Sequence, residues 1–471
     1  MTSMCSTRRT FLKASGAGGL GLILTARQAP AAIEKRPPNL LFMHLDQHCW
    51  EAVSAFGCTH VRTPNIDRLA AQGTSFSLSY SANPVCCPAR TCWYTGRASS
   101  ENGVVMNDQW PIAPDMPDLG QWLSARGYDS VYAGKWHVTG RTLTQSFRTL
   151  TPGSGLGEVT DGVVSRAAEG FLRSRQAGGK PFFLNVGFLQ PHDCCYWVME
   201  HGDGATHTRL GPLPPDIPPL PPNHSFDPQE PAALSRRRNK REGSGWSDDH
   251  WRWYLWNYYR MVEMADSEVG RVLDALEDAG LTEETLVVLT SDHGDGLARH
   301  GLTSKMFLYD EAARVPFIAS CPGRVQSGAR DTRHLVSGLD VAPTLCDFAG
   351  IEALPKVRGL SLRPLLEGRG GDAPWREFLV SDTFRTGRMV RTPEYKYITY
   401  QGDPVTQLFD MRSDPGELKN LAPDAAKADT VRDLARRLST WEKKLDIYPL
   451  KEPGPKKAGK RKNGGRNELH L

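Results

Sequence analysis

Cys86 and Arg90 are four residues apart in the segment C-C-P-A-R, and both side chains suit a site for an anion. The segment follows the turn-forming pair Asn83-Pro84, and Pro88 is typical of a first helical position because its missing N–H would have no partner there. Cys86 would then lie at a helix N-terminus, which favours negative charge, and Arg90 would share its face. A sulfur nucleophile, or an oxygen derived from it, could hold a tetrahedral oxyanion beside the arginine. Without the rest of the sequence, the simpler interpretation of Cys86 is a buried, unreactive thiol.

The string C-x-P-x-R followed by T-G-R resembles the signature of the sulfatase family, the formylglycine-dependent branch of the alkaline-phosphatase-like superfamily. Cys86, Pro88, Arg90 and the run 95–97 occupy its defining positions. In that family the first cysteine is oxidised after translation to formylglycine, and the hydrated aldehyde is the nucleophile. The resemblance implies that Cys86, and not Cys87, is the precursor. It also implies that a formylglycine-generating or sulfatase-maturating enzyme acts on this chain.

Two apolar segments end in polar side chains. They span residues 39–47 and 285–295, and each reads as a buried parallel strand whose polar end lies at the edge where α/β sheets place their sites. Two such ends that converge can build a metal site from distant parts of a chain. The family resemblance implies that a divalent cation binds there, to Asp46, Gln47, Cys86, Asp292 and His293.

The ligand at Gln47 and the identity of the metal stay open. The family has an acidic residue at the position of Gln47, whereas the amide oxygen of glutamine can bind a hard cation but brings no charge. Many sulfatases have asparagine where His293 stands, and a nitrogen ligand favours a transition metal. Ca²⁺ is expected on family grounds, with Mn²⁺ or Mg²⁺ as alternatives.

Further side chains that can carry positive charge follow other expected strands. Lys135 and His137 come after an apolar segment, and on an extended chain their spacing of two would project both to one side. His192 follows the apolar segment 181–188, on a loop. By resemblance Lys305 faces the sulfate, His192 contacts it or protonates the leaving group, and His137 helps to release it. The catalytic set implied is Cys86, Arg90, Lys135, His137, His192 and Lys305.

The resemblance extends from Asn39 to Leu445, nearly the whole chain. It implies an α/β fold, with a large mixed, mostly parallel central sheet flanked by helices and a smaller C-terminal antiparallel-sheet subdomain. Helical patterns support this at 251–276 and 430–444. The expected division is a twin-arginine signal peptide at 1–31, a catalytic domain at 38–350, a small α+β subdomain at 351–450 and a basic, disordered tail at 451–471.

The formal charge of +4 arises at the two ends of the 471-residue chain. Residues 1–31 carry four basic side chains and no acidic one, and residues 451–471 carry a net +5, so the body is near −5. Nothing resembles a nucleic-acid-binding domain with a basic face. The ten cysteines do not form a zinc pattern, and the adjacent pairs at 86–87 and 194–195 are poorly placed to bridge. The sequence assigns no disulfide.

The first residues resemble an export signal. Arg8-Arg9 lies in a twin-arginine pattern, a weakly apolar run follows at 14–24, and Ala29-Pro30-Ala31 suits cleavage. The apolar run is too short for a stable membrane span. We therefore expect the twin-arginine export machinery to be a partner, and a periplasmic or extracellular destination. Export of a folded protein would let Cys86 be modified beforehand.

These patterns predict a sulfuric ester hydrolase that releases inorganic sulfate from a sulfated sugar or polysaccharide. A phosphonate monoester or phosphodiester hydrolase of the same superfamily is the alternative, because His293 and Gln47 suit that branch. An inactive binding protein with an unmodified cysteine is a third hypothesis, against which the full set of positive side chains argues.

Overall fold

The computed structural model describes residues 36–201, 210–241, 245–371, 374–383 and 385–450. The described residues from Pro37 onward form one compact unit. The predicted signal peptide at 1–31 and the predicted tail at 451–471 lie outside the described residues. None of the described helices is both long enough and apolar enough to cross a membrane.

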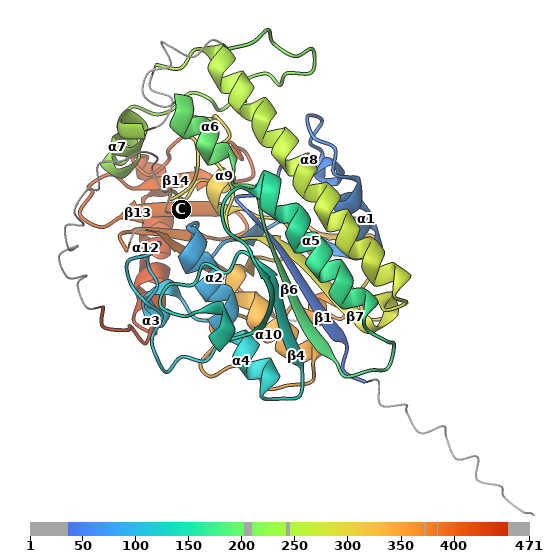
Figure 1. Ribbon diagram of the computed structural model, residues 1–471. Coiled ribbons are helices and arrows are strands. Elements are labelled where there is room, and N and C mark those ends of the chain that lie inside the picture. Colours follow the sequence, from blue (N-terminus) through green and yellow to red (C-terminus); the bar gives the residue numbers. More distant parts are fainter. Residues whose placement is uncertain (1–35, 202–209, 242–244, 372–373, 384, 451–471) are drawn as a thin grey trace, which may run out of the picture. The chain divides into compact units, whose positions relative to one another are not determined.

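A large central sheet crosses this unit (Figure 1). Strand β1 lies between β6 and β7 and is parallel to both, and among the described strands of the sheet only β8 runs against its neighbours. The strands in spatial order are β5 (Arg148–Pro152), β4 (Asp129–Gly134), β6 (Phe182–Pro191), β1 (Asn39–Asp46), β7 (Thr285–Ser291), β8 (Phe317–Ser320), β2 (Thr74–Phe76) and β9 (Ala329–Asp331).

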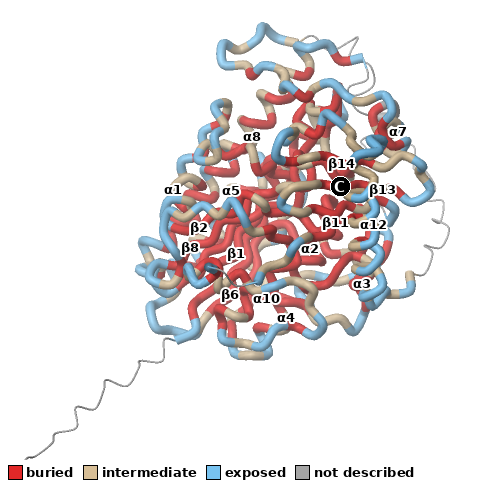
Figure 2. Tube along the Cα trace, turned by 180° about the vertical axis from the view of Figure 1, so that it is seen from behind, coloured by how far each residue is buried: buried red, intermediate tan, exposed pale blue. Residues whose placement is uncertain are grey.

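Every residue of β1 is buried, because helices cover both faces of the sheet (Figure 2). Side chains alternate along a strand, so Phe42 belongs to one hydrophobic core and Met43 to the other. The Phe42 side is covered by α2 (Cys86–Thr95), α4 (Leu119–Ser124) and α10 (Val341–Phe348). The Met43 side is covered by α1 (Pro64–Gln72), α5 (Gly157–Arg173) and α8 (Asp248–Asp278). His44 and Asp46 continue the Phe42 series, and the alternation therefore directs both toward α2.

A small antiparallel sheet follows in the C-terminal part. Its strands are β11 (Leu379–Thr383), β12 (Gly387–Arg391), β13 (Tyr395–Tyr400) and β14 (Gln407–Asp410). Leu434 and Leu438 of α12 (Ala428–Glu442) pack on it beside Val390 and Leu408. The predicted fold class is confirmed by both sheets, whereas the domain boundaries stay a prediction.

The remaining elements are short. The helices are α3 (Ser99–Asn102), α6 (Cys194–His201), α7 (Ala232–Arg241), α9 (Asp310–Ala313) and α11 (Arg363–Leu366), and β3 (Ser79–Tyr80) pairs with β10 (Val336–Ser337). The described cysteines form no disulfide. The predicted start of one helix was wrong: α2 begins at Cys86, so Pro88 is its third residue rather than its first.

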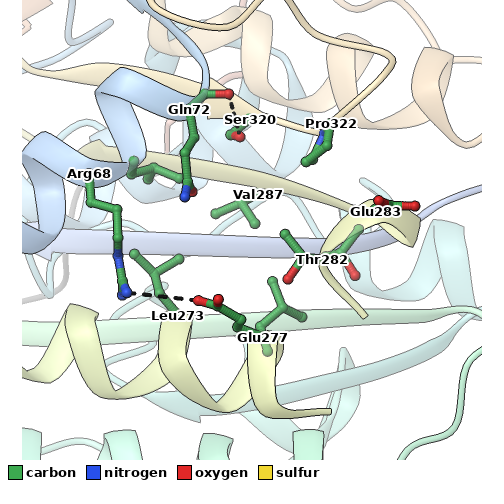
Figure 3. Close-up of a pocket in the computed structure, with 12 residues that line it drawn as sticks. Arg68, Gln72, Leu273, Glu277, Thr282, Glu283, Val287, Ser320 and Pro322 are labelled. Carbon is green, nitrogen blue, oxygen red and sulfur yellow. Dashed lines mark hydrogen bonds and ion pairs between the residues drawn. The ribbon is translucent and has the colours of Figure 1, made fainter. Parts of the chain in front are cut away.

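One cavity, of about 240 Å³, lies at the edge of the sheet where β7 begins (Figure 3). Arg68 of α1 reaches toward Glu277 of α8, with 3.9 Å between Nη1 and Oε2. Ser320 Oγ donates to the carbonyl of Gln72 at 3.1 Å. Asp292 and His293 follow the other end of β7, so this cavity is at the opposite edge from them.

Candidate active site

The side chain of Cys86 meets the ends of two central strands. Its Sγ lies 3.2 Å from Nε2 of His293 and 3.8 Å from Oδ1 of Asp46. Asp46 ends β1, and Asp292 and His293 follow the neighbouring β7. Ligand atoms of Asp46, Cys86, Asp292 and His293 all lie within 4.8 Å of one another, and all four residues are buried. The structure thus brings together the predicted nucleophile and three of the predicted metal ligands.

Arg90, four residues after Cys86 on α2, bonds to residues at both strand ends. Its Nη2 donates to Oδ2 of Asp46 at 2.7 Å, and its Nε donates to Oδ2 of Asp292 at 3.0 Å. Nη1 donates to the carbonyl of Lys135 at 2.8 Å. All three charged side chains are wholly buried, and a planar guanidinium satisfies several acceptors in fixed directions. Arg90 therefore fixes how the two carboxylates face the site.

Three further basic side chains lie around these carboxylates. Nζ of Lys135 is 2.9 Å from Oδ2 of Asp46, and Nε2 of His192 is 3.9 Å from Oδ1 of the same residue. His192 comes directly after β6. Lys305 lies on the loop after β7, and its Nζ donates to Oε1 of Gln47 at 2.8 Å. The predicted positive groups thus converge on the carboxyl ends of β1 and β7.

The surrounding charges set the ionisation of Cys86 and Asp46. Burial and then the Asp46 carboxylate raise the pKa of the Cys86 thiol, but Lys305, His293 and Lys135 outweigh them and hold that pKa well below its ordinary value. Burial likewise raises the pKa of Asp46, and Lys135 leads the cations that lower it well below its ordinary value. A site that stabilises anions to this extent can bind a sulfate group.

Gln47 is part of a hydrogen-bond chain. Its Oε1 accepts from Lys305, and its Nε2 donates to Oδ2 of Asp295 at 2.6 Å. Its backbone is left-handed, with φ of 71°, and its N–H donates to Oδ1 of Asp292 at 3.0 Å. The Sγ of Cys195 also lies 3.4 Å from this oxygen, so donors face both of its lone pairs and a cation bound there would have to displace one of them. The assignment of Gln47 as a metal ligand stays a prediction.

The chain is not extended at His137, so the expected extended geometry for Lys135 and His137 was wrong. β4 ends at Gly134, and His137 has left-handed backbone with φ of 51°. Its ring faces Asp108 and Cys87, with 3.6 Å between Nε2 and Oδ1 of Asp108. Burial lowers the pKa of His137, but Asp108 and the nearby sulfurs outweigh it and leave that pKa well above its ordinary value.

Sequence reasoning missed two supporting residues. His44 Nδ1 accepts from Nη1 of Arg90 at 3.2 Å, and its Nε2 lies 3.0 Å from Oδ1 of Asn185. Burial and then Arg90 lower the pKa of His44 well below its ordinary value, which keeps the ring neutral. Asp295 accepts from Gln47 and from Tyr254. The spacing of two between His44 and Asp46 on one strand could have revealed the first.

The donor set fits a divalent cation. Two buried carboxylates and one imidazole converge beside residue 86, which matches the oxygen and nitrogen ligands of Ca²⁺, Mg²⁺ or Mn²⁺ sites. Nδ1 of His293 lies 2.8 Å from the carbonyl of Gly294, as in metal sites whose histidine ring is oriented by a backbone acceptor. This leaves Nε2 of His293, on the side of Cys86, for the cation.

The sequence model of the family described as Sulfatase matches residues 38–351. This chain belongs to the sulfatase family. A second model, described as N-sulphoglucosamine sulphohydrolase, C-terminal, matches residues 298–444 of this sulfatase. The predicted family is thereby confirmed, and with it the prediction that the protein is a sulfuric ester hydrolase.

Similar proteins cover most of the chain. A Delta 4,5-hexuronate-2-O-sulfatase from Bacteroides thetaiotaomicron is 30% identical over 434 residues, which are 86% of this chain and 88% of that protein. The solved structure of a 2-O GAG sulfatase aligns with a TM-score of 0.77 and 28% identity, covering 87% of this chain and 92% of the other.

The alternative prediction has weaker support. A phosphonate monoester hydrolase of Agrobacterium radiobacter aligns with a TM-score of 0.73 at 22% identity, covering 86% of this chain and 95% of the other. That similarity extends to the fold alone. The evidence from sequence therefore favours the sulfatase over the phosphonate hydrolase.

Proposed function

We propose that this sulfatase releases inorganic sulfate from a sulfated sugar, with formylglycine at position 86 and a divalent cation beside it. The observation that carries the proposal is the position of Cys86. Its Sγ, at the first residue of α2, lies 3.2 Å from His293 and 3.8 Å from Asp46. A nucleophile there would meet a sulfur atom whose oxygens face the cations of the site.

The two groups that the chain does not encode have distinct chemistry. Formylglycine would supply a hydroxyl nucleophile from its hydrated aldehyde. The cation would be held by Asp46, Asp292, His293 and residue 86, and would supply positive charge toward the sulfate oxygens. Ca²⁺ is our first expectation, and the imidazole of His293 keeps Mn²⁺ as the alternative.

The side chains of the protein perform the remaining tasks. Lys135 and Lys305 are buried amines at the site, and they would stabilise the negative charge that builds on the sulfate oxygens. Arg90 holds Asp46 and Asp292 in place. His192, on the loop after β6, would donate a proton to the departing alcohol oxygen.

His137 has the complementary task. Its ring lies close to Cys86, and conversion of Cys86 to formylglycine would remove one of the sulfurs that raise the pKa of His137. We propose that it accepts the proton of the second hydroxyl at residue 86 while sulfate leaves. The two histidines would then act on opposite sides of the reaction, one on the alcohol and one on the aldehyde hydrate.

The substrate class follows from similarity. The relative with 30% identity is named for a 2-O-sulfated unsaturated hexuronate, and it covers 86% of this chain. We therefore propose a sulfated uronic acid or a related sulfated saccharide as substrate. The twin-arginine pattern at 8–9 supports export to the periplasm or beyond, after residue 86 has been modified inside the cell.

Sulfate release from defined compounds tests this proposal. The protein is produced together with a formylglycine-generating enzyme, and turnover is compared for a 2-O-sulfated unsaturated disaccharide, an aryl sulfate and an aryl phosphonate monoester. We expect the sulfated disaccharide to be the best substrate. Cys86→Ala should reduce sulfate release to background, whereas Cys87→Ser should retain it. Preferential hydrolysis of the phosphonate, or a free thiol at Cys86 in active enzyme, would overturn the proposal.

A further inference from the structure

Cys87, Asp108 and His137 form a second cluster of metal-binding side chains. One ligand atom from each lies within 4.8 Å of the others, and none of the three belongs to the cluster of Asp46. Nε2 of His137 is 3.6 Å from Oδ1 of Asp108. Cys87 is wholly buried on α2, while the side chain of Asp108 is 62% exposed. A thiol, an imidazole and a carboxylate thus meet between the core and the surface.

Hydrogen bonds from backbone N–H groups connect the segments that carry the three residues of the cluster. The N–H of Cys87 donates to Oδ1 of Asn107 at 2.9 Å, which ties the loop bearing Asp108 to α2. The N–H of Asp108 donates to Oγ1 of Thr139 at 3.3 Å, and the carbonyl of Thr139 accepts from Ile112 at 2.9 Å. The same loop is therefore also tied to the segment that follows His137.

The ring of His137 points to a missing ligand. Its side chain is 13% exposed, and neither ring nitrogen makes a hydrogen bond among the described residues, although Oδ1 of Asp108 lies 3.6 Å from Nε2. Burying a polar group without a partner costs free energy, so such groups are rare. The left-handed backbone of His137 adds strain, which proteins keep where the position of a side chain matters.

We propose that Cys87, Asp108 and His137 bind a zinc ion at a second, regulatory site. Cysteine sulfur, histidine nitrogen and carboxylate oxygen are the ligands that Zn²⁺ prefers, and three of them leave a fourth position for water. With Zn–N and Zn–O distances of about 2.0–2.2 Å, a nitrogen and an oxygen ligand of a tetrahedral zinc are roughly 3.3–3.5 Å apart. The separation of 3.6 Å between His137 and Asp108 is close to this range. Binding would release the thiol proton of Cys87 to solvent.

Occupation of this site would inhibit the enzyme. A nitrogen of His137 bound to zinc could not accept a proton from residue 86, so sulfate release would slow. This consequence rests on the role of His137 in the proposed function, whereas metal binding itself does not. The exposed carboxylate of Asp108 gives an entering cation its first contact.

Cobalt tests the site independently of activity. Co²⁺ is added to the Cys86→Ala protein, in which residue 86 has no thiol, and the sulfur-to-cobalt charge-transfer absorption is recorded. We expect a band that Zn²⁺ displaces, that Cys87→Ser abolishes, and that Asp108→Asn shifts to roughly 10–100-fold higher cobalt concentration. Cys58→Ser, which removes a partly exposed thiol that does not belong to the cluster, should leave the band unchanged. Absence of the band, or its persistence without Cys87, would overturn the proposal.

Inhibition is measured on the matured enzyme with saturating Ca²⁺. Zn²⁺ should inhibit the wild type, and Cys87→Ser should keep its basal activity because the signature C-x-P-x-R leaves that position free. The variant should need at least about tenfold more Zn²⁺ for the same inhibition. Equal inhibition of both proteins would overturn the regulatory role. An enzyme without sulfatase activity that still shows the cobalt band would refute the proposed function and leave the zinc site standing.

Discussion

Nη2 of Arg90 donates to Oδ2 of Asp46 at 2.7 Å, and neither side chain has any contact with solvent. Through its Nε the same guanidinium reaches Asp292 at 3.0 Å. The arginine of the family signature is thus placed as a support for the two strand ends. An ammonium group could not reproduce this geometry, because it lacks the planar set of donors.

Replacing Arg90 should therefore destabilise the whole protein. Arg90→Ala removes the guanidinium shared by two buried carboxylates and leaves Asp46 with Lys135, which should reduce the free energy of unfolding by about 3–5 kcal/mol. Arg90→Lys should recover only part of this loss. Chemical denaturation measures both, with Arg432→Ala as the control, since Arg432 is 71% exposed and its loss should change stability by less than about 0.5 kcal/mol. A stable, inactive Arg90→Ala protein would show that the arginine acts on substrate alone.

The bond between Gln47 and Asp295 predicts a pair of compensating substitutions. Gln47→Glu keeps the shape of the side chain but places a carboxylate oxygen 2.6 Å from Oδ2 of Asp295. We expect a loss of stability of about 1–3 kcal/mol, because a buried donor is replaced by a like charge. Asp295→Asn in the same protein returns a donor to the contact and should recover at least about 0.5 kcal/mol.

A double-mutant cycle by chemical denaturation provides the control for this pair. Asp295→Asn alone should also destabilise, since the new amide would face the amide of Gln47. Additive effects of the two substitutions would contradict the coupling, and would mean that each side chain acts through separate neighbours.

The sequence was sufficient to predict the strands that end at Asp46 and Asp292, because apolar runs followed by ligands occur at the carboxyl edge of buried sheets. It was also sufficient for the shared helix face of Cys86 and Arg90. It failed for His137, because a left-handed residue breaks the alternation on which a spacing of two depends. It missed Asp295, because a partner for Gln47 depends on tertiary contacts that no local pattern encodes.

Buried His300 should make the protein sensitive to acid. Its ring stacks on Tyr309 at a centroid distance of 4.1 Å, and burial, followed by Arg238, lowers its pKa to about 3. Histidine in the unfolded chain has a pKa of about 6.5. Below that pH the unfolded state therefore binds a proton that the folded state does not bind. The stability that the neutral ring contributes is present above pH of about 6.5 and is lost as pH falls toward about 3.

His300→Phe keeps the stacked ring and removes the titration. Between pH of about 6.5 and 5 the wild type should lose about 2 kcal/mol of stability relative to this variant. The two proteins are compared by urea denaturation, and their difference at pH of about 8 measures packing alone, since His300 is neutral there in both states. Parallel curves of stability against pH would show that the ring charges in the folded protein.

His293 should decide which metal the active site prefers. Its Nε2 faces Cys86, and its Nδ1 lies 2.8 Å from the carbonyl of Gly294, so one nitrogen is available to a cation. A chelator should destabilise the protein, and metal at about 100 times its dissociation constant should restore about 2.7 kcal/mol. His293→Asn replaces nitrogen by oxygen, so it should weaken Mn²⁺ more than Ca²⁺. Thermal unfolding with each metal checks this, with His250→Asn as the control. An unchanged order of the two metals in His293→Asn would exclude the imidazole as a ligand.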